Sequence, residues 1–331
     1  MKRLWVVGLS LILAAPMLLA AQRPVRIRLA TEAPAGSLWE VNLKQLAAEW
    51  REISDGQINM TIFPGGSAGD DAKVVSLLRT NRPEAAALTT GLARIDKAFN
   101  VFSLPFFFES NEELFAVLDR LEPELTSRLE DNGLTFLAWG FGGWVQVFSK
   151  EPVATLADLR RTKLWTSASE GDLLQWYKDN GFTPVPLSVA DAMAALSTGR
   201  IDAMPSPPYA AMAFQWYNRA PNMLDLRVAP IVGGIVVNTR VWNQVPAALR
   251  PRLLEAARDM DRRLRTDIPE QDAEAVVEMT KRGLTVAAKQ GAGWDELTAS
   301  LRDSMRGGMV PADVFDRAVR ERDAYRAGDR Q

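Results

Sequence analysis

Residues 25–63 read VRIRLATEAPAGSLWEVNLKQLAAEWREISDGQINMTIF, and this stretch decides the fold class. Apolar and basic residues alternate over 25–29, which predicts a strand with one buried face. Ser37 and Glu40 form a capping box at the start of a helix with one apolar face. A second alternating strand follows over 58–63. A strand, a helix and another strand in this order predict an α/β fold with a parallel sheet.

The same order of elements continues outward from this unit. We expect further strands over 85–89, 134–139, 163–165, 183–187 and 201–204, and further helices over 71–80, from 110, and over 170–180, 188–198 and 208–217. An apolar stretch over 228–237 is expected to cross between two lobes. A long helix is expected over 247–264, and Pro269 should kink it or separate it from a helix over 273–282. The last residues, 321–331, are expected to fray.

The N-terminus has the pattern of a secretory signal peptide. Lys2 and Arg3 precede an apolar run that ends at Leu19, and small residues follow. The run is shorter than the roughly 18 to 20 residues that span a bilayer, and no later segment of the chain is long and apolar enough to do so. We expect cleavage after residue 21 and a soluble mature protein in the periplasm.

The composition excludes several classes of function. His and Cys are both absent from the 331 residues. Their absence removes the usual general base, the serine triad, thiol nucleophiles and the commonest transition-metal ligands. Lys plus Arg is 39 and Asp plus Glu is 41, so the chain lacks the basic excess that nucleic-acid binding demands. We therefore expect a binding protein with no catalytic residues, no metal, no cofactor and no nucleic-acid partner.

Several segments resemble the solute-binding proteins of tripartite ATP-independent periplasmic (TRAP) transporters. They occur in the family's order over nearly the whole chain after the N-terminal segment. They are FPGGSAGD (63–70), LPFFFES (104–110), LADLR (156–160) with KL (163–164), residues 190–203, and NTRVW (238–242) with VP (245–246). The resemblance implies a periplasmic-binding-protein-like fold, in which two α/β lobes are joined by a hinge of crossing strands and braced by a long helix.

The resemblance also implies a division of the chain and a set of partners. We expect a signal peptide over 1–21, a first lobe over 22–143 plus 232–271, and a second lobe over 144–231 plus 272–331. A small-molecule ligand would bind between the lobes and pass to a small and a large TRAP membrane subunit. The oligomeric state is open.

The sequence departs from the family where the ligand is held. Carboxylate-binding members place an Arg at the end of the strand that here ends in Trp165, and that Arg forms a bidentate pair with the substrate carboxylate. A second family Arg falls near Val145, and a family Asn falls near Ser206. An unpaired buried carboxylate is costly, so the resemblance with this change predicts a mainly apolar or aromatic ligand. The expected ligand-binding residues are Trp165, Trp144, Phe141, Val145 and Ser206, with Phe63 or Pro64 at the edge of the cleft.

Other interpretations stay open from the sequence. An organic acid could be held by a different cation, such as Arg94 or Arg200. The same fold could also serve as a periplasmic carrier of lipids or other hydrophobic ligands, or as the partner of a sensor, without a transporter. A neighbouring sensor-kinase gene would favour that reading, and neighbouring genes for the two membrane subunits would favour transport.

Overall fold

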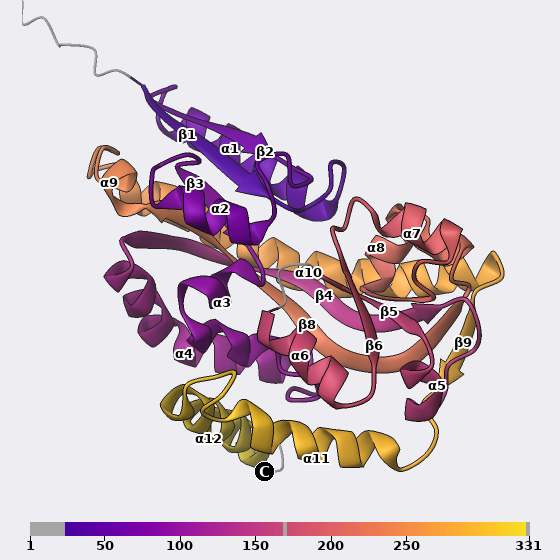
Figure 1. Ribbon diagram of the computed structural model, residues 1–331. Coiled ribbons are helices and arrows are strands. Elements are labelled where there is room, and N and C mark those ends of the chain that lie inside the picture. Colours follow the sequence, from indigo (N-terminus) through magenta and orange to yellow (C-terminus); the bar gives the residue numbers. More distant parts are fainter. Residues whose placement is uncertain (1–23, 168–170, 329–331) are drawn as a thin grey trace, which may run out of the picture.

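The computed structural model describes residues 24–167 and 171–328 (Figure 1). The expected signal peptide lies outside these residues. No helix among those that are described is long and apolar enough to span a membrane. The strands are β1 (Val25–Thr31), β2 (Ile58–Phe63), β3 (Ala85–Leu88), β4 (Leu134–Ser149), β5 (Lys163–Ser167), β6 (Thr183–Leu187), β7 (Ala203–Ser206), β8 (Asn222–Asn238) and β9 (Thr285–Ala288). The helices are α1 (Leu38–Ile53), α2 (Asp71–Leu78), α3 (Gly91–Ile95), α4 (Asn111–Asp131), α5 (Leu156–Arg160), α6 (Gly171–Asp179), α7 (Ala192–Thr198), α8 (Pro208–Ala213), α9 (Thr239–Trp242), α10 (Arg250–Lys281), α11 (Gly293–Met305) and α12 (Ala312–Gly328), with short 3-10 turns at η1 (Lys97–Ser103) and η2 (Trp216–Asn218).

The described strands form one curled sheet that runs through both lobes. Its order is β2-β1-β3-β8-β4-β7-β5-β6, and β9 pairs with β8. In the first lobe β1 pairs in parallel with β2 and β3, as the opening stretch of sequence predicts. The side chain of Ser37 accepts a hydrogen bond from the backbone N–H of Glu40 and so caps α1. The reciprocal bond of the expected capping box is not formed, because the Glu40 carboxylate accepts its hydrogen bond from the backbone N–H of Gly36. In the second lobe β5 pairs in parallel with β6 and β7.

Two long strands carry the chain between the lobes. β4 and β8 are antiparallel, and register shifts interrupt their pairing at three places, between 136 and 138, 141 and 144, and 145 and 147. One end of β8 pairs with β3 of the first lobe, and β4 pairs with β7 of the second lobe. The two long strands therefore connect the strands of both lobes in one sheet. The expected strand over 134–139 and the expected crossing over 228–237 are therefore only parts of strands of 16 and 17 residues.

The side chain of Trp39 packs flat against the crossing strands. Its indole Nε1 donates a hydrogen bond to the carbonyl of Phe141 at 3.2 Å. A Cβ added at Gly140 would lie 2.3 Å from Cη2 of Trp39, and one at Gly233 would lie 2.7 Å from the same atom. Glycine at both positions lets this ring lie directly on the backbone of the two strands. The first lobe is thereby fixed to the hinge at one buried tryptophan.

Helix α10 braces both lobes, as the family resemblance implies (Figure 1). It contacts the first lobe where its Leu253 carbonyl accepts a hydrogen bond from Nε1 of Trp50 at 3.0 Å. It contacts the second lobe where Oδ1 of Asp272 accepts a hydrogen bond from the backbone N–H of Tyr209 at 3.0 Å. Of the two outcomes expected at Pro269, a kink or a separation of two helices, the separation is wrong, because α10 is one helix of 32 residues that includes this proline. Packing on both lobes outweighs the one backbone hydrogen bond that proline removes.

The C-terminal segment returns across both lobes, and α11 and α12 follow one another along the lower edge of Figure 1. The expectation that residues 321–331 fray is wrong for 321–328, because α12 extends to Gly328, and the last three residues lie outside the described part of the chain. Arg317 pairs with Glu124 at 2.8 Å, and Arg326 pairs with Glu113 at 2.7 Å. Both glutamates lie on α4, so α12 packs on the first lobe, although the sequence places residues 272–331 with the second. The other lobe boundaries stay predictions.

Candidate functional site

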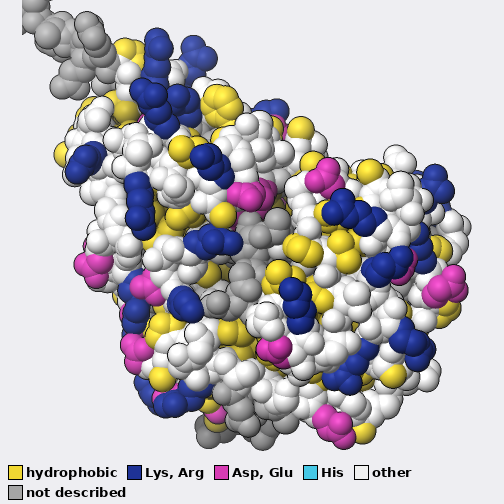
Figure 2. Space-filling model, viewed as in Figure 1, with side chains coloured by type: hydrophobic (Ala, Val, Ile, Leu, Met, Phe, Trp, Pro, Cys, Tyr) yellow, Lys and Arg dark blue, Asp and Glu magenta, His cyan; other side chains and the backbone are white. Residues whose placement is uncertain are grey.

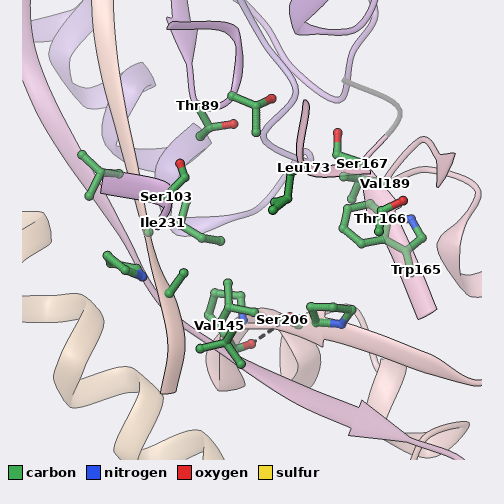
Figure 3. A pocket seen from close by; sticks show the side chains of 18 of the residues that line it. Thr89, Ser103, Val145, Trp165, Thr166, Ser167, Leu173, Val189, Ser206 and Ile231 are labelled. Atoms are coloured by element: carbon green, nitrogen blue, oxygen red, sulfur yellow. Dashed lines mark hydrogen bonds between the residues drawn. The ribbon is translucent and has the colours of Figure 1, made fainter. Parts of the chain in front are cut away.

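A cavity of about 660 Å³ lies between the lobes. Figure 3 shows Thr89 and Ser103 on one side of it, Trp165, Thr166, Ser167 and Val189 on the opposite side, and Val145, Ser206 and Ile231 on the strands between them. The first side belongs to the first lobe, where the carboxyl ends of β1 and β3 meet. Ligands gather at this edge in open α/β sheets. The cavity is the candidate ligand site.

Three of the expected site residues line this cavity: Val145, Trp165 and Ser206. The Ser206 hydroxyl donates a hydrogen bond to the carbonyl of Pro207 at 2.9 Å, drawn dashed in Figure 3. Trp165 is half-buried, and its ring packs against the core of the second lobe as well as facing the cavity.

The other four expected residues do not line the cavity. Trp144 is buried and donates a hydrogen bond from Nε1 to Oδ1 of Asn111 at 2.6 Å. Phe141 packs edge-on against Phe115, with ring centroids 5.3 Å apart. The bulge between Phe141 and Trp144 changes the direction in which these side chains point, which an alternating pattern does not predict. At the end of β2, Phe63 is partly exposed to solvent, and Pro64 follows it.

The cavity walls are mainly aromatic and aliphatic. Besides Trp165, the aromatic side chains that line the cavity are those of Trp39, Phe106, Trp176, Tyr177, Phe182, Tyr209, Phe214, Trp216 and Trp294. They come from both lobes and from α11. The sequence interpretation assigned Trp176 to the core and did not select the others. For those on α-helices, the spacing is the same for a core position and a cavity position, so only the fold distinguishes the two.

Three buried polar atoms at the cavity have no hydrogen-bond partner in the described part of the chain. They are the indole Nε1 of Trp165, Oγ1 of Thr166 and Oγ1 of Thr90. Thr166 is only 2% exposed. Buried polar groups are almost always hydrogen-bonded, and a polar atom left without a partner costs about 1 to 3 kcal/mol. These atoms are therefore available to hydrogen-bond a ligand that carries oxygen.

Two carboxylates also line the cavity, both from the first lobe. Burial, with a smaller contribution from the nearby charge of Asp71, raises the pKa of Glu32 to about 7. Burial likewise raises the pKa of Asp71 above its ordinary value, although hydrogen bonds from Gly91 and Thr89 oppose that shift. The loss of hydration disfavours the charged form of each acid.

Two cationic side chains, Arg94 and Lys97, line the cavity as well. Arg200, the other cation proposed from the sequence, is exposed and does not line it. No group of three or more acidic side chains that could hold a metal ion occurs among residues 24–167 and 171–328. Charged side chains of both signs are spread over the face of the molecule in Figure 2.

We call residues 289–310, some of which line the cavity, the strap. Trp294 and Leu297 of the strap line the cavity. On the second lobe, the carbonyl of Ala154 accepts hydrogen bonds from the backbone N–H of Gln290 at 2.9 Å and from Nε1 of Trp294 at 3.3 Å. On the first lobe, the Trp294 ring packs edge-on against Phe106, with ring centroids 6.4 Å apart. The strap therefore joins both lobes beside the site.

The comparisons with known proteins agree on one family of solute-binding proteins. The family model described as "Bacterial extracellular solute-binding protein, family 7" matches residues 29–307. The 2,3-diketo-L-gulonate-binding periplasmic protein of Escherichia coli is 23% identical over 241 residues, which is 71% of this chain and 73% of that one. The C4-dicarboxylate-binding periplasmic protein of Vibrio cholerae is 23% identical over 205 residues, 60% of each chain.

Solved structures have the same fold. An extracytoplasmic solute receptor of Bordetella pertussis that binds pyroglutamic acid is 19% identical, has a TM-score of 0.83, and covers 90% of this chain and 99% of its own. A TRAP periplasmic solute-binding protein of Ralstonia eutropha, solved with bound (S)-2-acetolactate, is 23% identical with a TM-score of 0.83 and covers 91% of this chain and 99% of its own.

Proposed function

Since the chain belongs to family 7 of the bacterial extracellular solute-binding proteins, the family of the TRAP receptors, we propose that it captures a small, mainly apolar or aromatic solute between its lobes. It would then deliver that solute to a small and a large TRAP membrane subunit. Members of this family are binding proteins of the periplasm and not enzymes. The finer proposal concerns the chemistry of the ligand.

The observation that carries the proposal is the aromatic lining of the interlobe cavity, with Trp165 where the resemblance implies an arginine. A cavity of about 660 Å³ has room for a ligand larger than a small dicarboxylate. Aromatic side chains supply large apolar contact area and prefer a ligand with a flat or aliphatic body. The orphaned Nε1 of Trp165 would bind an oxygen atom on that body.

A second candidate is an organic acid held by Arg94 and Lys97. Both cations line the cavity, which favours this reading over one based on Arg200. Several solved relatives were found with acids, among them galacturonate in a protein of Xanthobacter autotrophicus. An acid held in this way would still place its body against the aromatic walls.

Mass spectrometry of the molecule that co-purifies with the protein from its native periplasm tests the proposal directly. We expect a compound whose carbon skeleton is mostly apolar or aromatic. Titration calorimetry with succinate and with a sugar acid completes the test. Micromolar or tighter binding of either acid would contradict the proposal and favour the second candidate, and Arg94→Gln would then abolish that binding.

Substitution of Trp165 by alanine is expected to weaken binding of the co-purified solute by about 1 to 3 kcal/mol, or roughly 5- to 150-fold, because the ring loses its contact with the ligand. Trp165→Phe should retain most of the apolar contact and lose only the N–H donor. Trp165→Arg should not improve binding. Titration calorimetry measures all three. Phe63→Ala, outside the cavity, is the matched control, and an equal loss in that variant would show that the effect is not local.

A further inference from the structure

We infer that the solute carries a positively charged nitrogen, which binds beside Glu32 and Asp71 at the first-lobe wall of the cavity. The solute would thus be an organic amine, or a related cation, with an apolar body. This inference rests on the proposed function and adds to it the charge of the ligand. It assigns a role to two buried acids that the aromatic lining does not explain.

The two carboxylates lie close together in the fold. Glu32 follows β1, and Asp71 is the first residue of α2, so both lie at the carboxyl edge of the first-lobe strands. Both side chains line the cavity, and the negative charge of Asp71 is near enough to Glu32 to raise its pKa. Oδ2 of Asp71 accepts hydrogen bonds from the backbone N–H groups of Gly91 at 2.8 Å and Thr89 at 3.0 Å. Asp71 is therefore held in place by backbone N–H groups.

No Lys or Arg side chain pairs with Glu32 or Asp71 in the part of the chain that the structure describes. The negative charges of Asp71 and Asp70 raise the pKa of Glu32, and the charge of Asp70 raises that of Asp71. Arg94 and Lys97 line the same cavity. Two acids in a poorly solvated wall repel each other, and a nearby cation would offset that cost.

An organic cation fits this wall better than a metal ion. A hard metal ion takes six or more oxygen ligands, and no third His, Cys, Asp or Glu completes a metal-binding group with these two within the described residues. An ammonium group has three N–H donors and needs only two or three acceptors. Its apolar body would extend from the acids toward the aromatic walls.

An independent observation on the opposite lobe also points to a bound molecule. The Thr166 side chain lines the cavity, is 2% exposed, and has no partner for Oγ1 among the described residues. Trp165 beside it has an equally orphaned Nε1. A ligand that spans the cavity would place its cation at Glu32 and an oxygen atom at these two donors. The solute class is therefore an amine with an apolar body and an oxygen at the other end.

The test uses sets of three probes that share one body and differ only in the end group. Phenylalkyl and linear alkyl bodies of six to ten carbons are each prepared as the primary amine, the alcohol and the carboxylic acid. Binding of each to the full mature protein is measured by titration calorimetry at pH 8, where Glu32 is mainly ionised. We expect the best-fitting amine to bind at least about 10-fold more tightly than its alcohol.

Glu32→Gln keeps the shape of the side chain and removes its charge. In this variant the ratio of amine to alcohol affinity should fall to about 1 to 3, while the alcohol binds as before. Asp71→Asn should lower the ratio in the same direction. Glu112→Gln removes one exposed negative charge outside the cavity and should leave the ratio unchanged. Because each ratio is measured within one variant, a partial loss of stability does not imitate the result.

Three outcomes would overturn the inference. Equal binding of amine and alcohol would refute the cation site but leave the proposed apolar ligand in place. Tightest binding by the acid, with loss in Arg94→Gln, would replace the cation by a carboxylate and favour the second candidate function. If no probe with any of these bodies binds, the proposed function itself is contradicted, and the inference fails with it.

Discussion

Gly140→Ala is expected to lower the free energy of unfolding by about 3 kcal/mol, at the upper end of the range for an overpacked core. The new methyl group would lie 2.3 Å from Cη2 and 2.5 Å from Cζ2 of Trp39. The indole cannot turn away without giving up its hydrogen bond to the Phe141 carbonyl. Urea unfolding followed by circular dichroism measures the loss. Gly293→Ala, where the nearest atoms are at ordinary contact distance, is the control and should cost far less.

A double-mutant cycle identifies the cause of that loss. In the Trp39→Phe background, Gly140→Ala should cost at least 1 kcal/mol less than it does alone, because the clash at Gly140 involves only the indole. Gly233→Ala should not recover in the same background, since its Cβ would also lie 2.7 Å from the backbone carbonyl of Leu88. Equal recovery at both sites would mean that Trp39 does not hold the hinge strands as described.

The protein is expected to be more stable near pH 5 than near pH 8, by several kcal/mol. Burial raises the pKa of Glu32 to about 7 and that of Asp272 to about 7 in the folded protein. For a pKa raised by folding, the stability is fully present below the unfolded value and is lost as the pH rises through the folded value. Ionisation of each acid should therefore lower the free energy of unfolding by on the order of 2 to 3 kcal/mol between pH 5 and pH 8.

The composition leaves few other side chains that could titrate in this pH range. The chain has no His and no Cys, so the side chains that ordinarily titrate between pH 5 and 8 are missing. The low pKa of Asp158, about 2, affects stability only in stronger acid. Urea unfolding at pH 5 and pH 8 without ligand measures the difference. Glu32→Gln and Asp272→Asn should each reduce it, and a protein equally stable at both pH values would refute the burial of these charges.

The elements with local signals were predictable from the sequence. The cap at Ser37 and the alternation over 25–29 and 58–63 depend on neighbouring residues, and the structure has α1, β1 and β2 there. The length of β4 was not predictable, because its continuation depends on pairing with β8, about 90 residues further along the chain. Helices α11 and α12 were missed for a related reason, since α4 and α5 supply the surfaces on which they pack.

The candidate site was predictable only in part. Trp165, Val145 and Ser206 lie at strand positions that the family order locates, and all three line the cavity. Trp144 and Phe141 flank a bulge, and a change of one residue in register reverses the direction of a side chain. Trp294 lines the cavity although it is 129 positions from Trp165, and no local pattern connects the two.

The strap has a consequence for the speed at which a bound solute leaves. Because Trp294 contacts Ala154 on one lobe and Phe106 on the other, separation of the lobes at the cavity must break one of these contacts. Detachment of the strap would then set an upper limit on the dissociation rate for every solute that the closed site holds. Solutes of different affinity would share that limiting rate and would differ mainly in how fast they are captured.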